Sequence, residues 1–554
     1  MRETRRTYCV LCWVAGLTLA AILANLAAAA VNLSSASVFA ADPTGADGEL
    51  PAGLKIVAVE TQPGTIELTH KFDYRQLLVT GRLDTGEIVD LTRLVKPETP
   101  PKVAAISPNG LVTAVADGQE QIVLKYGAYS TPLTLKVTGA AVSPGVSFVG
   151  HVQPVLSKMG CNQGTCHGAK DGKNGFKLSL RGYDPIYDHR ALTDDIGARR
   201  FNRAAPDQSL LLLKATGSIP HVGGVRTEVG APHYEILREW IAGGVKLDLN
   251  APRVAKIEVF PKDPIVPRAG MRQQMVVHAT YTDGSTRDVT REAFIESGNI
   301  EVIEAAPSGV LTMLRRGEAP VLVRYEGAYA ATTIIVMGDR SGFSWNQPPV
   351  NNYVDEHVYK KLQRVKIAPS DLCADDEFLR RVYLDVTGVP PTVEEVKAFL
   401  ADPRDTRTKR DALVDKLVGS PAYVEHWTNK WADLLQVNRK FLGEEGAVAL
   451  RNWIKGAVAS NMRYDRFARE ILTASGSNLE NPPAAYYKIL RQPQDVMENT
   501  THLFLAIRFN CNKCHDHPFE RWTQDQYYQM AAFFAQIGRK EDPTYAGQRI
   551  GGSA

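Results

Sequence analysis

The segment RQLLVTGRLDTGEIVDLTR at residues 75–93 and the segment QQMVVHATYTDGSTRDVTR at residues 273–291 are two copies of one pattern. In each copy a run of β-prone residues leads to a turn that contains Asp and Gly, and then to an Asp-x-Thr-Arg ending. Asp and Gly at fixed offsets between such runs mark tight turns between strands. The pattern therefore predicts two similar β-domains in one chain.

The likeness between the copies extends over residues 72–137 and 270–337. Further matches pair Pro108-Asn109-Gly110-Leu111 with Pro307-Ser308-Gly309-Val310, Gly118 with Gly317, and Tyr126-Gly127-Ala128-Tyr129 with Tyr325-Glu326-Gly327-Ala328-Tyr329. Short strands that recur between glycine turns are typical of β-sandwiches, and each copy would need about 85–100 residues. We expect all-β sandwiches over residues 50–140 and 253–338.

The glycine and tyrosine pattern of the two copies resembles bacterial immunoglobulin-like domains of group two. The resemblance implies two immunoglobulin-like sandwiches, and we expect them to act as spacers. The alternative that it leaves open is contact with a glycan or a cell-surface partner, because a fold alone does not decide function.

The composition of the chain sets limits on its class. It has 554 residues, of which 44% are hydrophobic and 23% are charged, and its formal net charge is +3. This length predicts several domains rather than one core. The nearly balanced charge gives no reason to expect a nucleic acid as partner.

The first 40 residues are typical of an export signal. Arg2, Arg5 and Arg6 form a basic start, an apolar run follows over residues 8–30, and Val38-Phe39-Ala40 offers a cleavage site. The apolar run is also long enough to remain as an uncleaved helical anchor. Under either interpretation the chain is exported to the periplasm or the cell surface, and no later stretch is long and apolar enough to span a bilayer.

Two pairs of cysteines carry the chemical signal of the sequence. Each pair is followed directly by a histidine: Cys161 and Cys166 precede His167, and Cys511 and Cys514 precede His515. The chain has only 12 histidines, so two such placements are a rare coincidence. A c-type haem needs two thiols for thioethers with its vinyl groups and an adjacent imidazole for its iron. The pattern predicts one or two covalently attached haem c groups.

The first pair lies in residues 145–250, where we expect a small all-α domain. Four residues separate its cysteines, instead of the two of the standard haem motif. The segment resembles a small cytochrome c domain in the stretches Ala205–Leu210, Ile219–Gly224 and Tyr234–Gly243. This resemblance places His221 near the family's methionine ligand, which implies two imidazole ligands and electron transfer at relatively low potential. The alternatives are an ordinary loop histidine at 221 and a disulfide between Cys161 and Cys166.

The last region, residues 347–554, is predicted to be mainly α-helical. Thr392-Val393-Glu394-Glu395 forms a capping box that opens one helix, and Ser420-Pro421 opens another. A further helix over residues 497–507 leads to Cys511–His515, which has the standard C-x-x-C-H spacing for haem. A structural zinc site that adds His517 and a disulfide or redox pair are the alternatives. The remaining Cys373 is expected to be a buried small hydrophobe.

The stretch CNKCHDHPFERWTQDQYYQMAAFF at residues 511–534 resembles a cytochrome C-like domain of unknown function from planctomycete-type secreted proteins. The stretch RRVYLDVTGVPP at residues 380–391 is similar to the start of the same domain. The resemblance covers about 350–540. It implies a further large C-terminal domain after the motif, whereas this sequence ends at Ala554.

These observations favour an electron carrier over a catalyst. The sequence has no Ser/His/Asp constellation, no phosphate-binding glycine loop and no H-E-x-x-H motif. It predicts an exported haem-binding protein that transfers electrons outside the cytoplasm, and it does not identify the redox partner. The alternative is a cell-surface binding or scaffold protein whose Cys and His clusters form disulfides or a zinc site.

Overall fold

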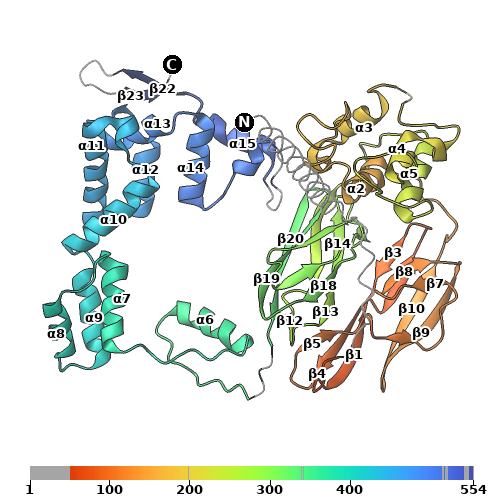
Figure 1. The fold of residues 1–554 in the computed structure, drawn as a ribbon, viewed down its shortest axis with the longest axis horizontal. Helices are drawn as coiled ribbons and strands as arrows, with labels where there is room; N and C mark the ends of the chain where they lie inside the picture. Colours follow the sequence, from red (N-terminus) through yellow and green to blue (C-terminus); the bar gives the residue numbers. More distant parts are fainter. Residues whose placement is uncertain are drawn as a thin grey trace, which may run out of the picture. The chain divides into compact units, whose positions relative to one another are not determined.

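The computed structural model describes residues 50–197, 199–338, 340, 342–514, 517, 522–541 and 548–552. The predicted export signal at residues 1–40 lies outside this part of the chain. Two compact units divide the chain at Ala368 and Pro369. Sheets of the β-sandwich type dominate the N-terminal half, and helices dominate the C-terminal half, as predicted (Figure 1). Within the described residues, no helix is both long and apolar enough to cross a membrane.

The first repeat forms three small sheets. Their strand orders are β1-β4-β5, β2-β10-β9-β6 and β3-β8-β7. The strands are β1 (Ile56–Gln62), β2 (Thr65–Leu68), β3 (Tyr74–Gln76), β4 (Leu78–Leu83), β5 (Ile88–Asp90), β6 (Lys96–Pro97), β7 (Ala104–Ile106), β8 (Leu111–Ala114), β9 (Gly118–Tyr126) and β10 (Tyr129–Val137).

The second repeat has the same arrangement, strand for strand. Its sheets have the orders β11-β14-β15, β12-β20-β19-β16 and β13-β18-β17. The strands are β11 (Val254–Phe260), β12 (Ile265–Val266), β13 (Arg272–Gln274), β14 (Val276–Tyr281), β15 (Thr286–Asp288), β16 (Phe294–Ser297), β17 (Ile303–Ala305), β18 (Val310–Met313), β19 (Gly317–Tyr325) and β20 (Ala328–Val336). The repeat in the sequence is therefore a repeat of structure.

Two matched glycines show why the sequence pattern is kept in both copies. Gly118 begins β9 with a φ of 151°, and Gly317 begins β19 with a φ of 156°. A Cβ atom would lie 2.9 Å from Cγ1 of Val103 at the first position and 2.8 Å from Cγ2 of Val302 at the second. Both values are too short for a real contact, so only glycine fits at the start of each of these long strands.

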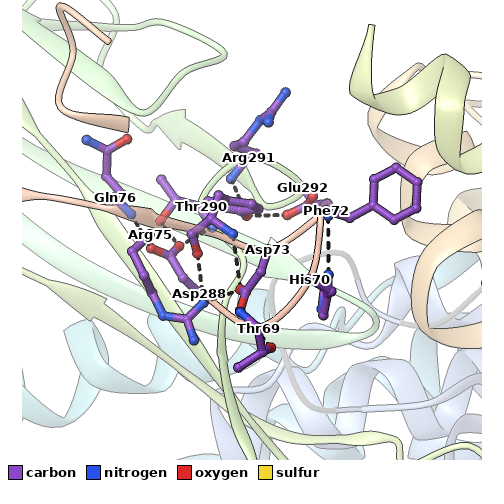
Figure 2. A network of polar contacts seen from close by, with 11 residues as sticks. Thr69, His70, Phe72, Asp73, Arg75, Gln76, Asp288, Thr290, Arg291 and Glu292 are labelled. Atoms are coloured by element: carbon purple, nitrogen blue, oxygen red, sulfur yellow. Dashed lines mark hydrogen bonds and ion pairs between the residues drawn. The ribbon is translucent and has the colours of Figure 1, made fainter. Parts of the chain in front are cut away.

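The two repeats pack against each other through equivalent residues. The backbone N–H of Gln76 donates to Oδ2 of Asp288 at 2.5 Å (Figure 2). In the same way, the backbone N–H of Gln274 donates to Oδ2 of Asp90 at 2.5 Å. The two glutamines occupy the same place in the pattern, and so do the two aspartates. The contact is therefore reciprocal, as in a two-fold symmetric dimer. One apolar core contains buried side chains from both repeats.

Short helices fill the segment between the repeats. They are the π-helix η1 (Phe148–Val152), α2 (Gln153–Lys158), η2 (Leu180–Gly182), α3 (Pro185–Thr193), η3 (Pro206–Gln208), α4 (Leu210–Ala215) and α5 (Pro232–Ala242). They enclose a separate apolar core around Phe148 and Trp240. Lys158 joins the segment to the second repeat, since its Nζ donates to the backbone oxygens of Ala293 at 2.6 Å and Pro307 at 3.0 Å. The likeness of this segment to a cytochrome c domain stays a prediction.

After the second repeat, the short helix α6 (Tyr353–Arg364) completes the first unit. The second unit is mainly helical, with one small sheet of order β21-β23-β22. Its elements are α7 (Asp375–Thr387), α8 (Val393–Leu400), α9 (Thr406–Leu417), α10 (Pro421–Leu434), α11 (Arg439–Ala459), α12 (Tyr464–Leu472), β21 (Gly476–Ser477), η4 (Pro482–Ala484), α13 (Ala485–Ile489), α14 (Pro493–Leu505), η5 (Asn510–Lys513), α15 (Gln524–Ala532), β22 (Ile537–Glu541) and β23 (Gln548–Gly552).

The predicted helix starts of the second unit agree with the structure. Thr392 and Glu395 form the capping box of α8, and the side chain of Ser420 caps α10. The helix predicted before the C-x-x-C-H motif is α14. The prediction for Cys373 is wrong: its side chain is half-buried, because it lies in the irregular stretch before α7 rather than within a core.

Candidate functional site

Residues 161–168 form a compact loop after α2. The N–H of His167 donates to the oxygen of Cys161 at 3.0 Å, and the N–H groups of Cys166 and Gly168 donate to the oxygen of Gln163 at 2.9 and 3.1 Å. A Cβ atom at Gly168 would lie 2.1 Å from the oxygen of Asn162, so the chain closes on itself here with no room for a side chain. The two extra residues of this motif are therefore absorbed in a defined turn.

Asn162 anchors this loop to the rest of the helical segment. Its side chain is buried, and Nδ2 donates to Oγ of Ser157 on α2 at 2.7 Å. Its backbone oxygen accepts from the N–H of Arg181 at 2.9 Å. These two hydrogen bonds, one from the side chain and one to the backbone of Asn162, fix the position of the neighbouring Cys161.

Both cysteines of the loop are free thiols. Cys161 packs against the apolar core of the helical segment, and burial raises the pKa of its thiol to about 12. Cys166 is half-buried. The structure thus shows the pair as two thiols, and the disulfide between them stays an alternative prediction.

The imidazole rings of His167 and His221 lie close to each other and nearly parallel. Their centroids are 6.5 Å apart, and the angle between their planes is 7°. Nδ1 of His167 lies 3.0 Å from the oxygen of Phe176, and Nδ1 of His221 lies 3.0 Å from the oxygen of Gly224. A carbonyl oxygen can only accept, so each Nδ1 carries the hydrogen. Nε2 of each ring is left with a free lone pair, which is the usual state of a metal-binding histidine.

The distance between the two ring centroids is close to that of two imidazoles bound to one metal ion. Two rings bound on opposite sides of a metal place their centroids about 6.4 Å apart, given metal–nitrogen bonds of about 2.0 Å and about 1.2 Å from nitrogen to ring centre. The observed separation is 6.5 Å. Burial and the nearby His221, Arg200 and Lys173 lower the pKa of His167, which keeps this ring neutral, as metal binding requires.

Gly223 makes room for the ring of His221. A Cβ atom at residue 223 would lie 2.8 Å from Cε1 and 3.1 Å from Nε2 of that ring. We expect Gly223→Ala to move the ring outward and to break its bond to Gly224, at a cost of about 1 kcal/mol. The measurement is the Nδ1–H signal of His221 in NMR spectra, which should broaden or vanish through exchange with water.

Gly164→Ala is the matched control, because a Cβ atom there would meet only Cδ1 of Leu180, at an ordinary 3.6 Å. Its spectrum should keep the His221 signal. An unchanged signal in Gly223→Ala would mean that the ring position does not depend on this glycine.

The second motif is only partly described. Cys511 and Cys514 are exposed free thiols on and directly after η5, and His515 lies outside the described residues. Asn512 between the cysteines is buried, and its Nδ2 donates to the oxygen of Trp522 at 2.6 Å. His517 is also buried, and its N–H donates to the same oxygen at 2.9 Å. The predictions for Cys511, Cys514 and His515 remain untested.

No group of three or more His, Cys, Asp or Glu residues is arranged to hold a metal ion in the part of the chain that the structure describes. The structure does bring His167 and His221 together, as the two-imidazole prediction requires. Sequence reasoning missed Phe176, Gly223 and Gly224, which orient the two rings. The pair Gly223-Gly224, one residue after His221, was a usable signal, because paired glycines mark turns in which the backbone comes close to a neighbouring group.

Comparison with known proteins finds one family. Residues 353–539 match the PSCyt2 model, described as a protein of unknown function (DUF1549). The match covers the region predicted to resemble a domain of unknown function, and the PSCyt2 region contains Cys511 and Cys514. It does not extend to the repeats or to the loop at Cys161, so the immunoglobulin-like and cytochrome-like resemblances stay predictions. No curated protein matches the chain.

Among solved structures, 22 chains match. The surface layer protein SbsC, domains 1–6, is 10% identical with a TM-score of 0.14, and the match covers 54% of this chain and 30% of that one. Domains 5–6 of the S-layer protein SbsC are 11% identical with a TM-score of 0.21, and the match covers 51% of this chain and 99% of that one. The chain thus spans less than a third of the first of these proteins, and at such TM-scores the likeness carries no argument.

Proposed function

We propose that this chain is an exported haem-binding protein that transfers electrons through a c-type haem. In this proposal Cys161 and Cys166 form the thioethers, and His167 and His221 bind the iron. The observation that carries it is the pair of nearly parallel imidazoles, 6.5 Å apart, next to two free thiols. The predicted export signal supports a place in the periplasm or at the cell surface.

The residues around the two rings fit this cofactor. Each ring is held by a backbone carbonyl through Nδ1, which leaves Nε2 for a metal. Val222 and Val225, on either side of the glycines that follow His221, expose large apolar side chains. A planar apolar macrocycle bound at His221 could cover such side chains, which is favourable because their apolar surface leaves water.

The chemistry that follows is electron transfer rather than ligand activation. A haem iron with two imidazole ligands supplies one-electron exchange and offers no open coordination position. The chain's own residues hold and orient the group: the carbonyls of Phe176 and Gly224 fix the rings, and the bonded loop fixes the cysteines. The proposal includes a second haem at Cys511, Cys514 and His515. This part rests only on the C-x-x-C-H spacing of the sequence.

The alternative function is a cell-surface binding or scaffold protein that uses the two repeats. The histidine that directly follows Cys166 favours the haem interpretation, because a disulfide between Cys161 and Cys166 would not explain His167.

The test is His221→Ala in protein expressed with a haem-attachment system. We expect the wild-type protein to keep its colour after denaturation, and the variant to keep haem at the first motif as well, because His221 is not an anchor. The Soret band and the reduction potential assigned to that haem should both shift, since one of two axial ligands is lost. The measurements are absorption spectroscopy and potentiometric titration.

His357→Ala on α6 is the control, because His357 is exposed and distant in sequence from the motif. Its spectrum and potential should equal those of the wild type. A colourless wild-type protein with free thiols would contradict the proposed function, and an unchanged His221→Ala spectrum would make His221 an ordinary loop histidine.

A further inference from the structure

A small cavity lies where the helical segment between the repeats meets both repeats. Its volume is about 30 Å³, which is room for one or two water molecules. His70 lines it from the first repeat, and His151 lines it from η1 of the helical segment. Arg287 and Glu292 line it from the second repeat. Two histidines from different parts of the fold therefore share one cavity with a guanidinium.

Both imidazoles of the cavity accept a hydrogen bond from the backbone. The N–H of Phe72 donates to Nδ1 of His70 at 3.2 Å (Figure 2). The N–H of Ser147 donates to Nδ1 of His151 at 3.1 Å. A backbone N–H can only donate, so each ring is neutral and carries its hydrogen on Nε2. An imidazolium has no acceptor, and protonation of either ring would therefore break its bond.

The residues that donate these two bonds hold the helical segment in place. Phe72 of the first repeat packs against the apolar core of that segment. Ser147 is the N-cap of η1, because its hydroxyl accepts from the N–H of Gly150 at 2.8 Å. The backbone oxygen of Gly150 accepts from Nη1 of Arg287 in the second repeat at 3.3 Å. Loss of either imidazole bond would thus loosen a contact between the helical segment and the repeats.

The surroundings of His151 oppose its protonation. Burial lowers the pKa of this ring to about 4, and the charge of Arg287 acts in the same direction, as does a protonated His70. The carboxylates of Glu292 and Asp248 act in the opposite direction but do not compensate.

The pKa of His70 is also lowered, first of all by burial. The carboxylate of Asp73 opposes this shift, and Arg287 and Arg75 add to it. Arg287 thus acts on both imidazoles, and a proton on either ring would place a like charge near its guanidinium.

The carboxylates of the cavity do not explain an acid response. Burial raises the pKa of Asp288, so this group favours the docked state as the pH falls. Burial also disfavours the charge of Glu292, but Arg287 and the hydrogen bond from Tyr74 keep its pKa below 4.5. Glu292 therefore stays ionised at about pH 5.

Lys158 and His233 of the helical segment face the same part of the second repeat, since Glu292 and Arg291 act on both. Burial lowers the pKa of Lys158 to about 8, so this group is charged before the histidines titrate. Burial lowers the pKa of His233 to about 4, and protonation of this ring therefore opposes docking as well.

We propose that His70 and His151 form a pH switch that controls the docking of the helical segment on the two repeats. In the docked state both rings are neutral and accept from Phe72 and Ser147. A proton that binds Nδ1 of either ring breaks the bond there and adds a positive charge near Arg287. The helical segment, which carries the first Cys-Cys-His motif, then separates from the repeats. The switch does not depend on haem.

The test is hydrogen exchange of the full-length protein, followed by mass spectrometry at about pH 7.5 and about pH 5. Peptides that contain residues 70–76 and 145–155 are compared through their protection factors, which correct for the effect of pH on the intrinsic exchange rate. The docked state is most stable above the ordinary histidine pKa of 6.5 and loses stability as the pH falls toward about 4. We expect the opening equilibrium to rise about 15- to 30-fold through His151 alone. Peptides of β9 and β19 should keep their protection.

The variant with both His70→Asn and His151→Asn shows whether these rings cause the response. The amide oxygen of Asn can accept from the same backbone N–H, and it does not titrate. The acid response should fall at least about 15-fold relative to the wild type, and the remainder belongs to His233. His357→Asn is the control, because His357 is exposed on α6 and its loss should leave the response unchanged.

An equal acid response in the double variant and the wild type would overturn the inference. If the double variant does not fold, the wild type decides: unchanged protection at both pH values, or a loss that includes β9 and β19, would also overturn it. None of these outcomes bears on haem attachment, so the proposed function is tested separately.

Discussion

Replacing both Cys161 and Cys166 by Ser should remove covalent haem from the first motif completely. Each thioether forms when a thiol S–H adds across a vinyl double bond: a carbon–sulfur bond forms, the proton goes to the second vinyl carbon, and no net oxidant or reductant is consumed. A serine hydroxyl does not make this addition. The measurement is the haem-bearing peptide found after denaturation and proteolysis, which should carry residues 161–166 in the wild type and be absent from the double variant.

Cys511→Ser with Cys514→Ser is the matched control, because it removes the same chemistry from the second motif and leaves the first untouched. The peptide with Cys161 should then keep its full haem content. Haem that stays on residues 161–166 in the first double variant, or that leaves them in the second, would contradict the assignment.

The structure gives a reason to expect attachment despite the longer spacing of the first motif. The bonds from Cys166 and Gly168 to the oxygen of Gln163 take up the two extra residues in a turn, so that His167 bonds back to the backbone of Cys161. The buried Asn162 holds that turn on α2. The longer spacing therefore produces a defined loop and not an open one.

Local patterns were enough to predict the repeats and the helix starts. The Asp-Gly turns, the matched glycines and the capping box at Thr392 act between residues that are close in sequence. The pairing of His167 with His221 was also predictable, from a resemblance that placed the second histidine. The contact of Phe176 with His167 was not predictable, because it joins residues nine positions apart through a backbone oxygen, which neither spacing nor hydrophobic period reveals.

The reciprocal contact between the repeats was hidden for the same reason. In the sequence, Asp90-Leu91-Thr92-Arg93 and its copy mark the end of the repeated pattern. Within the first repeat the motif bonds locally, since the N–H of Thr92 donates to Oδ1 of Asp90 at 2.7 Å. The other carboxylate oxygen, Oδ2 of Asp90, accepts from Arg93 of the same repeat and also from the N–H of Gln274 in the other repeat. The aspartates of this local motif therefore also form the hydrogen bonds that join the two β-domains.

Removing these aspartates should give the largest loss of stability in the first unit. Asp90→Ala leaves the N–H groups of Thr92 and Gln274 without an acceptor, and it removes the salt bridge that Asp90 forms with Arg93 at 3.0 Å. We expect a loss of about 3–4 kcal/mol. Asp288→Ala removes the acceptor of Gln76 and Thr290 but no salt bridge, so its cost should be about 2–4 kcal/mol. The measurement is the free energy of opening from hydrogen exchange of β9 and β19 amides.

Glu304→Ala is the control, because Glu304 is exposed on β17 and its loss should cost less than about 0.5 kcal/mol. The double variant then decides whether the repeats dock as one body. If replacing one aspartate already opens the shared interface, replacing the second costs less additional stability. The two losses of stability should then not add. Additive losses, with β9 responding to one aspartate and β19 only to the other, would mean that the repeats are stable separately. In that case the pairs Asp90–Gln274 and Asp288–Gln76 would be contacts between two independent domains and not the bonds that hold one double domain together.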